Sequence, residues 1–446
     1  MAKRYDVIVV GAGPAGFLAA KAAGENGLEV ALLERKTDIT QLTRACGQTL
    51  VSMNEYIFGD LCVYNARDKR ICFPVNGFSF KYDGPYKNIY ACHFYTPNGD
   101  IIELGNLKER REKGDHGTVG VAFDKEILFR CLLEEVKACS VNVFPGINVN
   151  KVTAEADGVK VEGSGRVFEG TYLIAADGVN SRIAQAMGFN KDRHYYCNFY
   201  SLSYYMSGIE LPEPDVIIYT HVLVKGGGAM FFIIPQSTNG DYNITGATVD
   251  PRVDLEAACD YFMKKEFCAS WFKKARKLRA FSALCNCYSP IIEPLKNNVL
   301  VAGDAGSTQE LENTGAMMSG WKAGQAISTA VHERNFGLET TGISEYVNWW
   351  KKAYINSYNH ETYMKTWALT HILTTEEEIS YVFGLIKETL RPCWNPYTSP
   401  LSQGLKKVMP TIQQERPELL QKLGTMSLPL SQIFAEVTKI SKPVVS

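Results

Sequence analysis

The sequence has almost no net charge and no apolar run long enough to cross a membrane. Its 446 residues include 47 basic and 48 acidic side chains, for a formal charge of −1. A balanced charge provides no extended positive field, which argues against nucleic acid as a partner. A membrane-spanning helix needs about 20 apolar residues in succession, and the chain has no such run. No secretory leader is expected, because a β-branched strand pattern begins at Tyr5. A cytoplasmic protein is therefore expected, with peripheral contact to a membrane left open.

The cysteines show no regular pattern, and the chain has no internal repeat or low-complexity segment. There are 12 cysteines, and most of them are expected to be reduced thiols in the cytoplasm. Cys285 and Cys287 are separated by one residue, which is not a usual zinc spacing, so both are interpreted as strand residues and no metal is expected. Because 446 residues exceed what one hydrophobic core can organise, two or three lobes are expected.

The N-terminal stretch YDVIVVGAGPAGFLAAKAAGENGLEVALLER has the pattern of strand, glycine turn, helix, strand and acid. Gly11 permits the tight turn, and Gly13 lets a pyrophosphate approach backbone N–H groups at the positive end of the helix. Gly16 lets that helix lie close to the strand. Glu34 follows the turn by about 20 residues, where a carboxylate accepts hydrogen bonds from ribose hydroxyls. The stretch predicts a dinucleotide site, which is expected to include also Pro14, Ala15 and Arg35.

Two later turns lie where ligands bind in open α/β sheets. The strand YLIAA lacks polar alternation, which is typical of burial on both faces, and it ends in Asp177-Gly178. The strand NVLVA has the same character and ends in Gly303-Asp304. Because the carboxyl ends of parallel strands meet at one edge of the sheet, both acids are expected beside the dinucleotide.

The position of the second turn, late in the chain, selects FAD over a nicotinamide cofactor. An aspartate there can accept hydrogen bonds from ribityl or ribose hydroxyls. The next helix, with Gly315 and Ala316 near its start, can place N–H groups at the flavin O2 edge, where negative charge grows on reduction. A nicotinamide enzyme needs no such distant turn, whereas the long FAD molecule does. The predicted cofactor is therefore FAD.

The segment after the second strand, Thr43-Arg44-Ala45-Cys46-Gly47, passes near the cofactor in a dinucleotide fold. Arg44 is interpreted either as a phosphate contact or as a solvated surface charge, and the residues leave both open. Cys46 is either a buried small hydrophobic residue or a thiol near a redox centre, and the sequence pattern alone favours the first interpretation.

Two segments have short, alternating, aromatic strands separated by turn residues, which predicts an antiparallel sheet. The expected fold class is α/β, with a Rossmann-like FAD-binding domain, an inserted antiparallel β-sheet substrate domain and a C-terminal helical lobe. In residue numbers, the prediction is a discontinuous FAD-binding domain of 1–50, 116–190 and 290–335, a substrate domain of 51–115 and 191–289, and a helical region of 336–446.

The aromatic residues of the predicted sheet suit a hydrophobic substrate. Most of them are expected to pack a core, and a few of the following to line a pocket: Tyr204, Tyr219, His221, Met230 and Phe232. In the helical lobe, the alternatives for Trp349, Trp350 and Tyr381 are capping the pocket, forming a dimer face, touching a membrane surface, or simply packing within the lobe.

Taken together, these motifs resemble the flavoprotein superfamily of the aromatic hydroxylases, and within it the geranylgeranyl reductase family. The resemblance covers roughly residues 5–335 and rests on GAGPAG, Glu34, Phe123-Asp124, ADGVNS with Asp177, and GDAG from Gly303. Cys46-Gly47 is similar to the Cys-Gly loop that this family carries beside the flavin, which implies a functional role for Cys46 and a cofactor contact for Gly47. The segment GAMFFIIP is similar to the strand that shapes the family's substrate cavity, which implies substrate contacts for Met230 and Phe232.

The resemblance implies an FAD-dependent reductase of carbon–carbon double bonds in a polyprenyl or lipid-like substrate, with hydride from the reduced flavin. A proton must reach the other alkene carbon, and the candidate donors are Cys46, Tyr219 and His221. No second nucleotide domain is recognisable, so a nicotinamide, a ferredoxin-like protein or another carrier is expected to supply electrons.

Two alternatives belong to other classes. A flavin monooxygenase or halogenase would act on a hydrophobic or aromatic small molecule, and oxygen consumption would reveal it. An electron-transfer flavoprotein would reduce a quinone, but the chain has no cluster-binding cysteine spacing.

Overall fold

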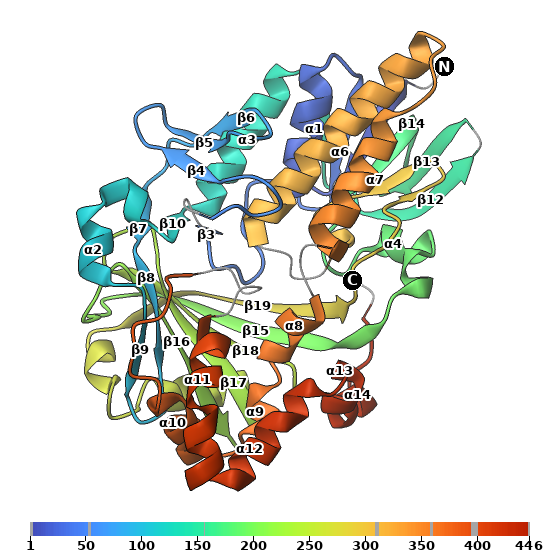
Figure 1. The fold of residues 1–446 in the computed structure, drawn as a ribbon. Helices are drawn as coiled ribbons and strands as arrows, with labels where there is room; N and C mark the ends of the chain where they lie inside the picture. Colours follow the sequence, from blue (N-terminus) through green and yellow to red (C-terminus); the bar gives the residue numbers. More distant parts are fainter. Residues whose placement is uncertain are drawn as a thin grey trace.

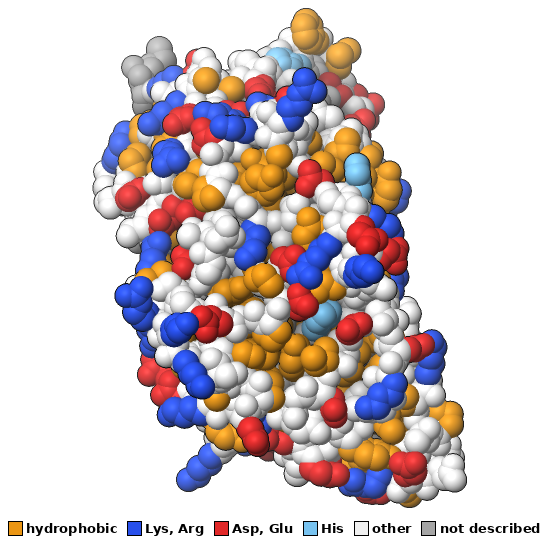
Figure 2. All heavy atoms as spheres, turned by 90° about the vertical axis from the view of Figure 1, so that its left-hand side faces the viewer, with side chains coloured by type: hydrophobic (Ala, Val, Ile, Leu, Met, Phe, Trp, Pro, Cys, Tyr) orange, Lys and Arg blue, Asp and Glu red, His pale blue; other side chains and the backbone are white. Residues whose placement is uncertain are grey.

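A computed structural model of the chain describes residues 3–51, 55–155, 157–307, 312–356, 360–393 and 400–444. The molecule has two halves (Figure 1). A mostly parallel sheet with long helices forms the upper half of this view, and a large antiparallel sheet with the C-terminal helices beneath it forms the lower half. Basic and acidic side chains are interspersed over the face shown in Figure 2, as the near-zero net charge predicts.

The upper sheet contains the N-terminal motif. Its strand order is β11-β2-β1-β14-β13-β12, with β21 beside β14 and β20 beside β21. The strands are β1 (Arg4–Val10), β2 (Val30–Glu34), β11 (Val141–Pro145), β12 (Val149–Glu155), β13 (Gly158–Gly163), β14 (Arg166–Ala175), β20 (Leu295–Lys296) and β21 (Val299–Val301). Strand β1 is parallel to β2 and β14, and β14 is parallel to β21. The carboxyl ends of β2, β14 and β21 therefore lie at one edge, where Glu34, Asp177 and Asp304 are found.

Three helices cover one side of this sheet: α1 (Pro14–Glu25), α3 (Lys125–Ala138) and α6 (Glu312–Asn335). Helices α1 and α6 pack closely, because a Cβ on Gly320 or Gly324 would overlap with carbonyl oxygens of α1. Helix α3 begins at its predicted N-cap, Asp124, whose carboxylate accepts hydrogen bonds from the backbone N–H groups of Glu126 and Ile127.

The lower sheet has the order β19-β15-β18-β17-β16-β8-β9. Its strands are β8 (Ala91–Tyr95), β9 (Ile101–Leu104), β15 (Tyr195–Ser207), β16 (Val216–Val224), β17 (Gly227–Pro235), β18 (Asp241–Thr248) and β19 (Arg276–Tyr288). The pairs are antiparallel except β8 with β16, which run parallel. Helix α5 (Leu255–Phe262) covers the face of this sheet that is turned away from the upper half.

Smaller elements connect the two halves. Strands β3 (Thr49–Val51), β10 (Gly120–Phe123) and β7 (Tyr86–Ile89) form one three-stranded sheet, and β4 (Val63–Asn65), β5 (Arg70–Phe73) and β6 (Phe78–Lys81) form another. The second of these packs on the upper half, where the ring of Phe78 stacks on Trp321 of α6 with ring centroids 4.6 Å apart. Short helices α2 (Leu107–Glu112) and α4 (Arg182–Ala186) complete the chain before the C-terminal helices.

The C-terminal part of the chain is helical, as predicted. It contains α7 (Gly342–Trp350), a π-helical segment (Lys351–Asn356), α8 (His360–Thr366), α9 (Leu369–Ile372), α10 (Glu376–Gly384), α11 (Pro400–Glu415), α12 (Pro417–Gly424), α13 (Leu430–Ile433) and α14 (Ala435–Ile440). Trp350 is fully buried and donates to the carbonyl oxygen of Ile291. Tyr381 donates to Glu415 at the surface. Every helix within the described ranges is too short or too polar for a transmembrane span.

Candidate active site

One cavity of about 570 Å³ extends from the glycine turn of the upper half to the large sheet and the C-terminal helices. Most of the residues predicted from the sequence line it: Gly11, Gly13, Pro14, Ala15, Glu34, Arg35, Arg44, Cys46, Gly47, Asp177, Gly178, Tyr219, His221, Met230, Phe232, Asp304 and Ala316. Gly16, Gly303 and Gly315 instead support the backbone around it. A Cβ on Gly16 would overlap with the carbonyl oxygen of Gly11, Gly303 has a φ of +61°, and the carbonyl of Gly315 accepts a hydrogen bond from Tyr354.

The glycine turn leaves room for a phosphate. Gly11 has a φ of +99°, which an L side chain rarely adopts. A Cβ on Gly13 would meet no atom within 4 Å, so the start of α1 opens directly into the cavity. Backbone N–H groups at a helix N-terminus attract anions, and this turn therefore fits the pyrophosphate of FAD.

Glu34 already has structural partners. Its Oε2 accepts a hydrogen bond from the backbone N–H of Ala12 at 2.7 Å, and its Oε1 accepts one from the backbone N–H of Lys36 at 2.8 Å. The side chain is only 6% exposed, and it faces the cavity. Each carboxylate oxygen can accept more than one hydrogen bond, so both remain able to bind ribose hydroxyls. Glu34 thus fixes the glycine turn as well as offering acceptors to a cofactor.

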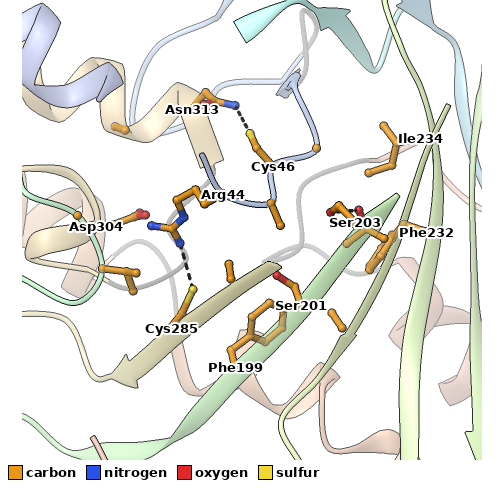
Figure 3. Close-up of a pocket in the computed structure, with 18 of the residues that line it drawn as sticks. Arg44, Cys46, Phe199, Ser201, Ser203, Phe232, Ile234, Cys285, Asp304 and Asn313 are labelled. Carbon is orange, nitrogen blue, oxygen red and sulfur yellow. Dashed lines mark hydrogen bonds between the residues drawn. The ribbon is translucent and has the colours of Figure 1, made fainter. Parts of the chain in front are cut away.

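Arg44 points into the cavity rather than to the outer surface, so the interpretation as a solvated surface charge is wrong. Its guanidinium lies between Asp304 and Cys285 (Figure 3), and its Nη2 donates to Cys285 Sγ at 3.1 Å. Burial raises the pKa of Asp304, and the positive charges of Arg44 and Lys125 act in the opposite direction.

Asp177, the third acid at this edge, is tied to helix α4. It accepts hydrogen bonds from the hydroxyl of Ser181 and the backbone N–H of Ile183, while burial raises its pKa. Asp177 therefore shapes the loop around the cavity through its side chain, and Gly178 beside it has a φ of +87°.

The sulfur of Cys46 is surrounded by nitrogen donors. Lys125 Nζ lies 3.3 Å from Cys46 Sγ, the backbone N–H of Gln48 lies 3.4 Å from it, and Asn313 Nδ2 lies 3.9 Å from it. Figure 3 shows the contact between Asn313 and Cys46 at the top of the pocket. These neighbours are polar, unlike the apolar neighbours of a buried hydrophobic residue. The interpretation of Cys46 as a buried small hydrophobic residue therefore does not fit its surroundings.

The backbone of the Cys46 loop is held against the large sheet. The carbonyl oxygen of Cys46 accepts hydrogen bonds from Tyr205 Oη and Asn243 Nδ2, both at 2.9 Å. The next turn of the loop is held by Gln48, whose Nε2 donates to Gln236 Oε1 at 2.8 Å. These contacts join the two halves of the molecule at Cys46.

Strand register decides which residues of the large sheet line the cavity. Two rows cross the sheet from β16 through β17 and β18 to β15, and they consist of Tyr219, Phe232, Thr245 and Ser203, and of His221, Met230, Ala247 and Ser201. One end of each row is bulky and the other end is small. Across the sheet, the cavity is therefore lined by bulky side chains on β16 and β17 and by a hollow of small hydroxyl and methyl groups on β18 and β15.

Tyr204 was one of five residues of which a few were expected to line a pocket, and it does not line the cavity, whereas the other four do. Successive side chains of a strand point to opposite faces, so Tyr204 lies on the other side of the sheet from its neighbours Ser203 and Tyr205. There it belongs to the core beneath α5, with Lys277 Nζ 3.4 Å from the centroid of its ring.

The protonation of Tyr219 and His221 bears on their candidacy as proton donors. Burial lowers the pKa of His221 to about 4 and raises the pKa of Tyr219 well above its ordinary value. At neutral pH His221 is therefore neutral and Tyr219 holds its proton firmly. Both are therefore weak proton donors in this setting.

The lowered pKa of His221 predicts a specific dependence of stability on pH. An unfolded histidine binds a proton below about pH 6.5, whereas folded His221 stays neutral down to about pH 4, so acidification favours the unfolded state. His221→Phe, which suits neighbours Phe94 and Phe383, should remove about 2 kcal/mol of the stability loss between pH 7 and pH 5. Urea unfolding at both pH values measures this difference. An equal loss in wild type and variant would contradict the buried, neutral state.

The far end of the cavity is closed by the C-terminal helices. Its lining there comes from residues that the sequence patterns did not single out, namely Tyr363, Thr366, Trp367, Leu369, Phe383, Cys393, Leu401, Leu405 and Met426. The tryptophans that were considered, Trp349 and Trp350, pack instead in the core beside α6. An amphipathic sequence predicts that one face of a helix is buried. It does not predict whether that face packs against other side chains or lines a cavity.

Comparisons with known proteins agree with this picture. Residues 4–63 match the model of a family described as an FAD binding domain. Digeranylgeranylglycerophospholipid reductase 1 of Methanococcoides burtonii is 21% identical, over 87% of this chain and 89% of the relative. The digeranylgeranylglycerophospholipid reductase of Methanocaldococcus jannaschii is 23% identical, over 81% of this chain and 86% of the relative.

Solved structures show the same fold. A geranylgeranyl bacteriochlorophyll reductase-like protein from Thermoplasma acidophilum superposes with a TM-score of 0.67 at 16% identity, over 95% of this chain and 99% of that one. The halogenase PltM, in complex with phloroglucinol and FAD, superposes with a TM-score of 0.58 at 14% identity, over 98% of this chain and 97% of the other. The predicted fold class and the predicted FAD cofactor are confirmed.

Proposed function

We propose that this chain, an FAD-dependent oxidoreductase related to the geranylgeranyl reductases, reduces carbon–carbon double bonds of a polyprenyl or lipid-like substrate. The observation that carries the proposal is the cavity, which joins the dinucleotide turn to a large half lined by apolar and neutral side chains. Such a lining suits a long apolar chain. The glycine turn, Glu34 and Asp304 would hold FAD, which supplies a hydride when it is bound and reduced.

The protein has to deliver a proton as well. An isolated alkene is a poor hydride acceptor, so protonation of the second carbon must accompany hydride arrival in a site that excludes water. We assign this role to Cys46, because its sulfur lies at the junction of the two halves of the cavity. Once the proton has left, the Lys125 ammonium and the Gln48 N–H would stabilise the sulfur, and Tyr205 would keep the loop in place.

The C-terminal helices have a separate task in this proposal. Trp367, Leu401 and Leu405 close the cavity on the side away from the cofactor and keep water from the reacting carbons. The part of the chain that the structure describes contains one glycine turn of the dinucleotide-binding type. We therefore expect a diffusing nicotinamide or a ferredoxin-like carrier to supply electrons from outside.

An anaerobic experiment tests the function. The purified yellow protein is reduced with dithionite, a polyprenyl lipid extract is added, and the flavin absorbance is followed. Reoxidation without oxygen, together with the gain of two hydrogens in the lipid by mass spectrometry, is the expected result. If the flavin stays reduced until air is admitted and an oxygenated product then forms, the enzyme is a monooxygenase and the proposal fails.

Cys46→Ser should retain FAD and slow substrate-dependent flavin oxidation by about 100-fold or more, because a hydroxyl is a much weaker acid than a thiol. Stopped-flow absorbance under anaerobic conditions measures the rate. Cys92→Ser is the matched control, because Cys92 is a buried thiol of β8 that lines the same cavity. Wild-type rates in the Cys46 variant would remove Cys46 from the proton path.

A further inference from the structure

We infer that His221 binds the neutral polar end of the substrate, so that the hydrocarbon chain crosses the large sheet toward Cys46. This inference rests on the proposed function. It names the substrate class as an uncharged prenyl compound, such as a prenyl alcohol, and it gives the substrate one orientation in the cavity. His221 is only 3% exposed and lines the cavity from β16.

The His221 imidazole has no hydrogen-bonding partner within the described residues. The rings of Phe94 and Phe383 lie beside it, with centroids 5.5 and 6.5 Å from its own. A buried polar group without a partner is costly. A trapped water needs about two to four polar partners, whereas these neighbouring rings are apolar. A neutral imidazole has one N–H donor and one acceptor nitrogen, so a ligand hydroxyl can satisfy it.

No charged group acts on His221 within the described part of the chain, because burial alone lowers its pKa to about 4. An uncharged ligand group therefore suits this end of the cavity, where a buried anion would lack a counter-ion. Two cations lie at the other end. Arg44 donates to Cys285 on β19, as Figure 3 shows. Lys125 Nζ lies 3.3 Å from Cys46 Sγ. An anionic end group would be attracted there rather than to His221.

A row of side chains joins His221 to the Cys46 loop. One residue from each of the neighbouring strands β16, β17, β18, β15 and β19 lies on this row and lines the cavity: His221, Met230, Ala247, Ser201 and Ala283. Neighbouring strands are about 4.8 Å apart, so the row is roughly 19 Å long. Its far end adjoins the loop, because the carbonyl oxygen of Ser282 accepts a hydrogen bond from the backbone N–H of Ala45. The middle of the row is apolar or small, which suits a hydrocarbon chain.

The length of the row determines which double bond of the substrate lies beside Cys46. With the polar end at His221, an extended chain places its allylic double bond over β16 and β17. A more distant double bond reaches Cys46, whose carbonyl oxygen bonds to Tyr205 of β15 and Asn243 of β18. The enzyme should therefore reduce a double bond remote from the hydroxyl group. A polar end held by the cations beside Cys46 would instead bring the allylic double bond there.

The first test locates the reduced double bond in the wild-type enzyme. The FAD-loaded protein is reduced with dithionite in D2O without oxygen, and geranylgeraniol is added for a single turnover. NMR of the product then locates the deuterium. We expect deuterium at a double bond remote from the hydroxyl group. Reduction of the allylic double bond would overturn the inference, because the polar end would then lie beside Cys46.

The second test measures binding and needs no turnover. Equilibrium dialysis of the FAD-loaded enzyme compares geranylgeraniol with the corresponding hydrocarbon, which lacks the hydroxyl group. His221→Phe should weaken binding of the alcohol about tenfold and leave the hydrocarbon unchanged, because it removes one hydrogen bond and keeps a ring. His221→Gln should restore alcohol binding, since its amide can again donate and accept. Unchanged alcohol affinity in His221→Phe would overturn the inference. So would tighter binding of geranylgeranyl diphosphate than of the alcohol, which would place the polar end at Arg44 and Lys125.

His93→Phe is the matched control. His93 is also a buried histidine whose pKa is lowered by burial, but it lies on β8 outside the cavity lining. This variant should bind both probes as the wild type does. A wild-type flavin spectrum in each variant establishes correct folding. An equal loss of alcohol affinity in both phenylalanine variants would overturn the assignment to His221.

Failure of this inference differs from failure of the proposed function. If geranylgeraniol reoxidises the reduced flavin without oxygen but loses its allylic double bond, only the orientation is wrong. If the polyprenyl lipid extract reoxidises the flavin and geranylgeraniol does not, the substrate class is wrong. If neither reoxidises it, the reductase proposal itself fails, and the inference falls with it.

Discussion

Gly16→Ala should abolish FAD binding and also destabilise the apoprotein. Gly13→Ala should impair FAD binding without changing the stability of the apoprotein. A Cβ at position 16 would overlap with the carbonyl oxygen of Gly11, which belongs to the turn itself and cannot move without opening it. Overpacking of this kind costs about 3 kcal/mol. At position 13 a Cβ would meet no atom within 4 Å, and the φ of −81° suits any L residue. That same Cβ would occupy the space that a pyrophosphate needs.

The two variants should therefore separate folding from cofactor binding. The FAD-to-protein absorbance ratio measures occupancy, and urea unfolding of the apoproteins measures stability. The Gly13 variant should unfold at the wild-type midpoint and bind FAD at least about 100-fold more weakly, because lost phosphate contacts are charge-assisted. Normal FAD content in the Gly13 variant would show that the cofactor does not approach this turn. Normal stability in the Gly16 variant would show that the turn can relax.

Glu34→Ala should weaken FAD binding by about 100-fold to 1000-fold. The substitution removes acceptors for ribose hydroxyls and also leaves the buried N–H of Ala12 and the partly buried N–H of Lys36 without their partner. An unsatisfied buried N–H costs about 1–3 kcal/mol, and hydrogen bonds to a charged group contribute about 1.5–3 kcal/mol. Glu34→Gln should show a smaller loss, because it keeps the shape and one acceptor oxygen.

Fluorescence titration of the apoproteins with FAD measures the affinity, and titration with FMN, which lacks the adenosine ribose, isolates the ribose contribution. FMN binding should change less than FAD binding in the Glu34 variants. Glu29→Ala is the control, since Glu29 is an exposed acid near β2 that pairs with Lys3. Unchanged FAD occupancy in Glu34→Ala would rule out the ribose contact.

The parts of the fold that the sequence predicted are those determined locally. The glycine turn, the N-cap at Asp124 and the acids after buried strands each depend on a few adjacent residues. Their approximate place in space follows because parallel strands share an edge. The large sheet was also predictable as a sheet, since its alternation is strong.

The sequence could not predict which face of that sheet lines the cavity. Alternate residues of β15 face opposite sides of the sheet, with Tyr204 on one side and Ser203 on the other. The alternation does not say which side faces the cofactor. Of the aromatic candidates considered, Tyr204 lies on the face away from the cavity. The hydroxyl hollow depends on register across β15 and β18, which is a property of the folded sheet.

The residues around Cys46 could not be predicted from the sequence for a related reason. Lys125 and Asn313 come from α3 and α6, which are far from Cys46 in the sequence and match no local motif for a thiol site. The closure of the cavity by α8–α11 depends in the same way on tertiary packing. The resemblance to a family indicated Cys46, and only the structure indicates its partners.

The central place of β1 in the upper sheet has a consequence for biosynthesis. This strand leaves the ribosome well before one of its two neighbours, β14, which begins only at Arg166. At about 5–20 residues per second, the apolar edge of β1 waits on the order of 10 s for that partner. Unpaired apolar edges recruit other chains. FAD cannot protect the edge meanwhile, because Asp304 and the start of α6 are made later still. The yield of soluble protein in a cell should therefore follow chaperone supply more closely than it follows the stability of the finished fold.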